Sequence, residues 1–220
     1  MKNKLDVENK VLLFDFDGTL VETEIVAKKV IDLYFEERKF PQLSDVADMI
    51  VGRTWKAATE SIHEHAKGLG VDLDPPAVMA LELKARYQEA FKKGVGMIPG
   101  FKECLPYFKK NAKFLGIVTG SDRHEVQIIL EQHGLLGVFD QVWGFGDYEH
   151  SKPDPSPYLT AMAAIQANPK DVVVFEDSKA GMESATRAGI PFVQICFEEH
   201  ALEPDARALL TIHDWNELLK

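Results

Sequence analysis

Two carboxylates, Asp15 and Asp17, stand two residues apart at the end of an apolar run that begins at Val11. Side chains at this spacing project from the same side of an extended chain, so both acids would face one direction. Gly18 then lets the backbone leave the extended segment in a tight turn. A helix cap explains a single acid at a strand end, but not two. The pair therefore indicates a polar site at the end of a buried strand.

Three further segments carry side chains suited to an anion or a cation. Thr119-Gly120-Ser121-Asp122 stands where a helix is expected to begin, and a hydroxyl with backbone N–H groups there can hold an anion. Glu176 and Asp177 follow a second apolar run, and such oxygen ligands suit Mg²⁺. Lys152 is followed by two prolines that restrict the backbone of its loop. Taken singly, helix caps and a surface lysine explain these segments equally well.

The elements that would position these residues alternate between strand and helix. The first, second and fourth strands are nearly continuous apolar runs, as expected of parallel strands covered on both faces. We predict an α/β fold with a Rossmann-like open parallel sheet and right-handed crossovers. The carboxyl ends of such strands share one edge, where the four polar segments would meet. The expected strands are residues 11–16, 114–119, 141–144, 172–176 and 192–196, with a last one near 209–212.

One segment, residues 22–95, breaks this alternation. It contains helix-like stretches at 25–38, 56–67 and 77–92 and no convincing strand, and a stretch rich in glycine follows it. We predict that residues 22–95 form a small α-helical cap domain. It would be inserted into a discontinuous α/β catalytic core made of residues 1–21 and 96–220.

Composition limits the classes of function. The chain carries 25 Lys and Arg against 35 Asp and Glu, a net charge of −10, which disfavours binding to nucleic acid. A phosphorylated ligand would therefore need a local cation such as Lys152. No apolar run approaches membrane-spanning length, and two cysteines, Cys104 and Cys196, are too few for a disulfide scaffold. We expect a cytoplasmic protein without nucleic-acid or membrane partners, and the sequence indicates no protein partner.

The segments DFDGTL, IVTGSD, SKPDP and VFEDS, in this order and spacing, resemble the four motifs of the haloacid dehalogenase-like superfamily. The resemblance covers essentially the whole chain. The helical insertion is similar to the small cap of the subgroup that holds phosphoglycolate phosphatases and β-phosphoglucomutases. The resemblance implies a Mg²⁺-dependent phosphatase that hydrolyses small phosphate monoesters, such as sugar phosphates or phosphoglycolate-like compounds, through an aspartyl-phosphate intermediate.

The resemblance also implies a role for each motif residue. Asp15 would attack phosphorus, and Asp17 would protonate the leaving oxygen and then activate water. Thr119, the Gly120 backbone and Lys152 would hold the transferring phosphoryl oxygens. The implied Mg²⁺ ligands are Asp15, the backbone carbonyl of Asp17, Asp177, and Glu176 either directly or through water.

Other members of the superfamily suggest alternative activities. True dehalogenases lack the second acid of the first motif, so Asp17 disfavours dehalogenation. A mutase stays open, because Glu176-Asp177 and the segment 51–54 are similar to features of β-phosphoglucomutases. Arg53 in that segment could contact the substrate or lie on a solvated helix face. A non-catalytic phosphate-binding module is a third alternative, disfavoured because every chemically required position is filled.

Overall fold

The computed structural model describes residues 5–40, 43, 46, 55–197 and 202–219. The chain forms two compact units. One consists of Met1–Val21 together with Gly96–Lys220, and the other of Glu22–Val95.

A six-stranded sheet forms the centre of the first unit, in the order β3-β2-β1-β4-β5-β6, and all its neighbouring strands are parallel. The predicted α/β fold with an open parallel sheet is confirmed. The first strand ends two residues earlier than expected, because the Phe16 carbonyl already accepts hydrogen bonds from Leu20 and Val21 in the following turn. The strands are β1 (Val11–Phe14), β2 (Phe114–Val118), β3 (Gln141–Trp143), β4 (Val172–Glu176), β5 (Phe192–Ile195) and β6 (Leu210–Ile212).

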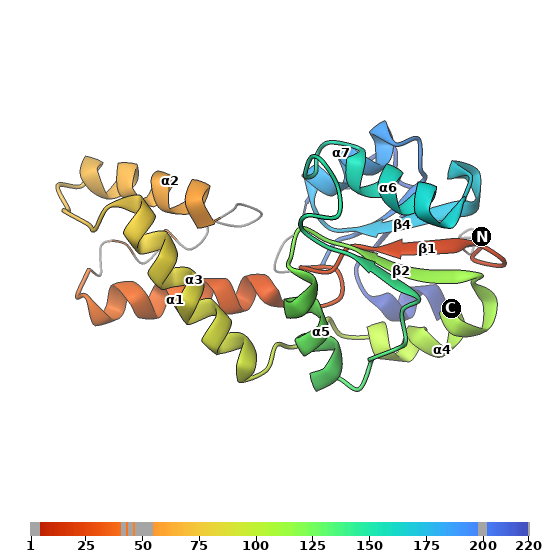
Figure 1. The fold of residues 1–220 in the computed structure, drawn as a ribbon, viewed down its shortest axis with the longest axis horizontal. Helices are drawn as coiled ribbons and strands as arrows, with labels where there is room; N and C mark the ends of the chain where they lie inside the picture. Colours follow the sequence, from red (N-terminus) through yellow and green to blue (C-terminus); the bar gives the residue numbers. More distant parts are fainter. Residues whose placement is uncertain (1–4, 41–42, 44–45, 47–54, 198–201, 220) are drawn as a thin grey trace. The chain divides into compact units, whose positions relative to one another are not determined.

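Helices cover both faces of this sheet (Figure 1). One face carries α4 (Phe101–Asn111) and α5 (Arg123–Gln132). The other carries α6 (Ser156–Ile165) and α7 (Lys179–Arg187). A short 3₁₀ helix, η3 (Pro169–Asp171), precedes β4, and a second, η5 (Trp215–Leu219), packs on α4 near the C-terminus. Burial on both faces explains why β1, β2 and most of β4 are continuously apolar rather than alternating.

Alternate residues of β1 enter two different cores. Val11 and Leu13 belong to the cluster that includes residues of α6 and α7. Phe14 instead joins aromatic rings on the opposite face, where it stacks on Phe175 with ring centroids 4.7 Å apart. The strand is thus fixed from both sides, since burying one large apolar side chain contributes about 1.5–3 kcal/mol. The other rings around Phe14 are those of Phe101, Phe108, Phe139 and Trp215.

The second unit is helical in its described part. It contains α1 (Thr23–Glu37), α2 (Trp55–Gly68) and α3 (Pro76–Lys92), which starts directly after Pro75. Both α1 and α2 pack on α3. Their shared apolar core is formed mainly by Ile31, Tyr34, Phe35, Ile62, Met79 and Leu83.

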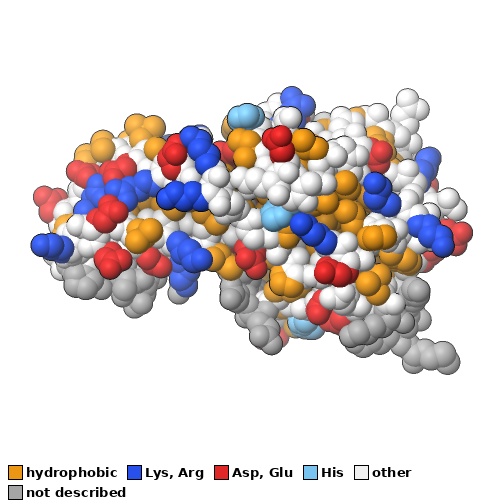
Figure 2. Space-filling view, turned by 90° about the horizontal axis from the view of Figure 1, so that it is seen from below, with side chains coloured by type: hydrophobic (Ala, Val, Ile, Leu, Met, Phe, Trp, Pro, Cys, Tyr) orange, Lys and Arg blue, Asp and Glu red, His pale blue; other side chains and the backbone are white. Residues whose placement is uncertain are grey.

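The surface mixes charges of both signs. On the face shown in Figure 2, acidic and basic side chains lie interspersed among apolar ones, so the net charge of −10 does not form a single acidic field there. In the part of the chain that the structure describes, no helix has the length and apolar character needed to cross a membrane.

Candidate active site

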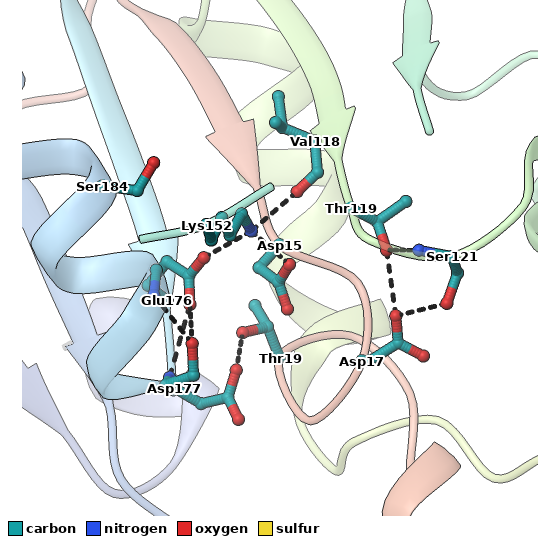
Figure 3. A network of polar contacts seen from close by, with 12 residues as sticks. Asp15, Asp17, Thr19, Val118, Thr119, Ser121, Lys152, Glu176, Asp177 and Ser184 are labelled. Atoms are coloured by element: carbon teal, nitrogen blue, oxygen red, sulfur yellow. Dashed lines mark hydrogen bonds and ion pairs between the residues drawn. The ribbon is translucent and has the colours of Figure 1, made fainter. Parts of the chain in front are cut away.

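Three neighbouring strands present their ends to one ammonium group. Phe14 of β1 pairs with Ile117 of β2 and with Phe175 of β4. The next position in this register holds Asp15, Val118 and Glu176. Lys152 Nζ lies 2.5 Å from Asp15 Oδ1, 3.0 Å from the Val118 carbonyl oxygen and 2.5 Å from Glu176 Oε1 (Figure 3). The sheet therefore brings Asp15 of the first motif and Glu176 of the fourth motif to a single lysine. This edge lies where the strand order changes direction beside β1, which is where open α/β sheets bind ligands.

The loop that carries Lys152 is anchored on α7. Ser184 Oγ donates a 2.6 Å hydrogen bond to the Asp154 carbonyl, and Arg187 Nη1 donates to the Pro153 carbonyl at 3.4 Å. The Lys152 side chain is only 12% exposed, and its ammonium lies 5.0 Å from the centre of the Tyr158 ring. The lysine is thus held in place, and the ring adds a favourable cation–π contact.

Burial dominates the electrostatics of this group. It raises the pKa of the Asp15 carboxyl well above its ordinary value, and the nearby Glu176 and Asp17 add to the rise while Lys152 opposes it. Burial alone would lower the pKa of Lys152, but the carboxylates of Asp15 and Glu176 outweigh it and hold that pKa high. The raised pKa of Asp15 reflects the cost of ionising a buried carboxyl beside other acids, a cost that a bound cation would lower.

The Asp17 side chain points to the loop that directly follows β2. Its Oδ2 accepts hydrogen bonds from Thr119 Oγ1 at 2.9 Å and from Ser121 Oγ at 2.7 Å (Figure 3). The sequence alone does not distinguish Ser121 from Asp122 as the cap of the helix that follows. The cap of α5 is in fact Asp122, which accepts from the His124 N–H at 2.8 Å, so the Ser121 hydroxyl is available to Asp17.

Asp177 is held by the turn that follows the first motif. Thr19 Oγ1 donates a 2.7 Å hydrogen bond to Asp177 Oδ1. Gly18 has a φ of +80°, and a Cβ there would lie 2.3 Å from Asp177 Oδ2, so only glycine permits this approach. The sequence suggested glycine for a tight turn, but gave no signal for the role of Thr19.

Glu176 is fully buried and accepts hydrogen bonds on both oxygens. Oε1 accepts from Lys152 and, at 2.7 Å, from the Tyr158 hydroxyl. Oε2 accepts from the Ser178 N–H at 3.3 Å and from its hydroxyl at 3.1 Å. Ser178 also caps α7, since its Oγ accepts a hydrogen bond from the Gly181 N–H. Tyr158 was missed because a buried tyrosine in an apolar helix is indistinguishable from a core residue in sequence.

Three carboxylates could share a metal ion. Asp15, Glu176 and Asp177 can each offer one oxygen within 4.8 Å of the others. Hard oxygen ligands with excess negative charge fit a divalent cation such as Mg²⁺. The Asp17 side chain is not in this group, and the resemblance assigns only its backbone carbonyl to the metal. Arg53 lies outside the described residues, and Gly120 is an exposed residue directly after Thr119.

The fold and site define a doubly wound α/β protein with an acidic, lysine-centred cluster at the switch point of its sheet. A model of the haloacid dehalogenase-like hydrolase family matches residues 12–195, and the chain belongs to this family. The resemblance of the four motifs is thereby confirmed, and the protein is a hydrolase of this superfamily.

Characterised relatives and a solved structure match over nearly the whole chain. A phosphorylated carbohydrates phosphatase of Thermotoga maritima is 33% identical over 215 residues, which cover 91% of this chain and 90% of the relative. A validoxylamine A 7'-phosphate phosphatase of Streptomyces hygroscopicus subsp. limoneus is 30% identical over 210 residues, 95% of each chain. The structure of a haloacid dehalogenase-like protein of unknown function from Agrobacterium tumefaciens aligns with a TM-score of 0.79 at 25% identity, covering 96% of both chains.

Proposed function

We propose that the protein is a Mg²⁺-dependent phosphatase that hydrolyses small phosphate monoesters, with sugar phosphates as the first class to test. One observation carries the proposal: Asp15 Oδ1 lies 2.5 Å from Nζ of the partly buried Lys152, and Asp15 offers an oxygen within 4.8 Å of two further carboxylates. Such a site can neutralise a phosphoryl group while presenting a nucleophile to it. The similarity to phosphatases that are named for a phosphorylated carbohydrate and for validoxylamine A 7'-phosphate supports the substrate class.

In the first step of the proposed mechanism, an oxygen of Asp15 attacks phosphorus. A bond forms between that oxygen and phosphorus, the ester P–O bond breaks, and Asp17 gives its proton to the leaving oxygen. The hydroxyl of Ser121, which donates a hydrogen bond to Asp17 Oδ2, fixes the position from which the proton is delivered. Lys152 balances the charge on the phosphoryl oxygens, and Thr119 and the Gly120 backbone bind them.

In the second step, a water molecule attacks the aspartyl-phosphate. Asp17 now accepts a proton from that water, the acyl-phosphate bond breaks, and inorganic phosphate and the Asp15 carboxylate are released. The two steps use the same acid in opposite directions. A mutase would instead pass the phosphoryl group back to a sugar hydroxyl, so the fate of the intermediate separates the two activities.

Mg²⁺ would be held by Asp15, the backbone carbonyl of Asp17 and Asp177. When bound, it would neutralise charge on the attacking carboxylate and on the phosphoryl oxygens. We infer that Glu176 contacts the metal through water. This is supported by the hydrogen bonds from Lys152, Tyr158 and Ser178, which use the acceptor capacity of both its oxygens.

Residues 22–95 are the proposed cap, which would select the substrate, with Arg53 as a candidate contact to it. We also place the enzyme in the cytoplasm. The two buried cysteines, Cys104 and Cys196, support this location because both are free thiols rather than a disulfide.

The test is phosphate release from a panel of phosphorylated sugars and phosphoglycolate, with Mg²⁺ and with EDTA, for the wild type and Asp15→Asn. We expect Mg²⁺-dependent release that Asp15→Asn loses, because an amide cannot serve as the nucleophile. Asp122→Asn is the matched control, since this exposed acid caps α5 and lies outside the proposed machinery. Full activity of Asp15→Asn would contradict the mechanism. Isomerised sugar phosphate without phosphate release would identify a mutase.

A further inference from the structure

A tryptophan from the end of the chain is bonded to the turn of the first motif. Trp215 is the first residue of η5 and is completely buried. Its indole Nε1–H donates a hydrogen bond of 3.2 Å to the backbone carbonyl of Thr19. A buried indole N–H needs an acceptor, and here the acceptor is two residues after Asp17, the proposed acid.

The same threonine contacts the proposed metal site through its side chain. Thr19, also fully buried, donates its hydroxyl proton to Asp177 Oδ1 at 2.7 Å. Two hydrogen bonds in series therefore connect Trp215 to a carboxylate of the proposed metal site. The first fixes the backbone of Thr19, and the second fixes the direction of the Asp177 side chain.

The segment that carries Trp215 is itself held by residues at the start of α4 and just before it. Cys104 Sγ donates to the Trp215 carbonyl at 2.9 Å. Gly100, with a φ of +83°, leaves room for the segment, because a Cβ there would lie 2.7 Å from Asp214 Oδ1 and 3.1 Å from Trp215 Cβ. The indole is thus a rigid donor, held from α4 and directed at the catalytic turn.

We propose that Trp215 is a positioning residue for the metal site, acting on Asp177 through the Thr19 carbonyl and hydroxyl. The inference rests on the proposed function, since Asp177 is a metal ligand only if that function is correct. Residues that orient a metal ligand typically change metal affinity by 10–100-fold when they are removed. Trp215→Phe keeps an aromatic ring in the core and removes only the N–H donor with part of the ring.

The experiment is calorimetric titration of Mg²⁺ into the metal-free protein, which measures binding without turnover. Trp215→Phe and Thr19→Val should each weaken Mg²⁺ binding by about 10-fold. The double variant should bind Mg²⁺ no more weakly than the weaker-binding single variant, because both substitutions interrupt the same chain of hydrogen bonds. Phe139→Leu is the matched control: its ring belongs to the same aromatic core as Phe14 and Phe101, and no hydrogen bond joins it to the turn. It should lose stability and keep the wild-type affinity.

The outcomes separate this inference from the proposed function. Unchanged Mg²⁺ affinity in Trp215→Phe, with lowered stability, would make Trp215 a core residue only and overturn the inference. Failure of the wild type to bind any divalent cation would overturn both. If Trp215→Phe does not fold, the indole N–H resonance of Trp215 in the NMR spectrum of the wild type decides instead. The variants Trp55→Phe and Trp143→Phe identify the resonances of the other two tryptophans and so assign that of Trp215. The inference requires that it shift during the Mg²⁺ titration, and an unmoved resonance would contradict it.

Discussion

The carboxylate of Glu176 fills the space that a side chain at Gly181 would need. A Cβ at Gly181 would lie 1.8 Å from Glu176 Oε1 and 2.1 Å from Oε2. Gly181 lies inside α7, where glycine costs up to about 1 kcal/mol relative to alanine. The helix therefore gives up some intrinsic stability so that the carboxylate can reach Lys152 and Tyr158.

Gly181→Ala should consequently move Glu176 and lower both stability and activity. The helix propensity of alanine favours the opposite result, so a loss of stability identifies the clash as the cause. Gly68→Ala is the matched control, because a Cβ at this helical glycine meets nothing within 4 Å. We expect that control to keep full activity and unchanged or raised stability, measured by urea unfolding and phosphate release. A Gly181→Ala protein that matches Gly68→Ala in both respects would refute the steric explanation.

Tyr158→Phe should destabilise the protein without loss of packing. The change removes the hydroxyl that donates to Glu176 Oε1 and leaves the ring in place. A hydrogen bond to a charged group contributes about 1.5–3 kcal/mol, and we expect a loss of that order in the free energy of unfolding. Phosphate release should also slow, because Glu176 helps to hold Lys152. Tyr107→Phe, a hydroxyl removed from α4, controls for the substitution itself; equal losses in the two variants would contradict a special role for Tyr158.

Lys152→Met should make stability more dependent on Mg²⁺. It leaves the carboxylates of Asp15 and Glu176 buried without their shared ammonium. Breaking a buried ion pair in this way costs about 3–5 kcal/mol, which we expect in urea unfolding of the metal-free variant. Added Mg²⁺ should recover part of the loss, so its stabilising effect should be larger than in the wild type. Lys179→Met, at an exposed lysine of α7, serves as control. Equal stabilisation by Mg²⁺ in wild type and Lys152→Met would show that the lysine does not balance these carboxylates.

The helical unit should lose an electrostatic contribution in acid. Arg38 and Arg86 bind Glu82 at 2.7 and 2.9 Å, and these hydrogen bonds, that from Arg38 first, lower its pKa. A folded-state pKa below the unfolded value of about 4.3 stabilises the protein above that pH. The contribution disappears as the pH falls through the folded-state pKa. Glu82→Gln should thus reduce the free energy of unfolding by about 0.5–1 kcal/mol at pH 7 and by progressively less below about pH 4.

Urea unfolding at a series of pH values measures this difference. The control is Glu89→Gln, because the Glu89–Lys92 pair is an exposed ion pair within one helix and should contribute little. A Glu82→Gln difference that persists unchanged to pH 3 would show that the carboxylate charge is not responsible.

The sequence contained enough information for the sheet and for the acidic cluster. Buried parallel strands are apolar throughout, so their runs can be recognised, and the shared edge of a parallel sheet then brings Asp15, Lys152 and Glu176 together. The end of β1 was placed two residues too late because Phe16 continues the apolar run although its carbonyl belongs to the next turn. The apolar pattern reflects burial, and burial continues beyond the last hydrogen bond that β1 forms with its neighbouring strands.

The supporting residues could not be predicted in the same way. Ser121 and Asp122 are both good helix caps, and only the geometry decides which of them caps α5. Tyr158 and Trp215 are aromatic residues in apolar surroundings, which predicts a place in the core but not a hydrogen-bond partner. Thr19 needs partners 158 positions ahead and 196 positions ahead, relationships that no local pattern encodes.

The inserted segment leaves and re-enters the core at adjacent backbones. Val21 forms an antiparallel bridge with Met97, and the Ile98 N–H donates to the Leu20 carbonyl at 2.9 Å. These contacts join the two ends of the core directly, and they do not depend on the length or sequence of residues 22–95. Under the proposed function, this direct connection makes residues 22–95 a module that can be exchanged. Substrate preference can diverge in it, or be changed in the laboratory by replacing it, while the strand that presents the nucleophile keeps its partners.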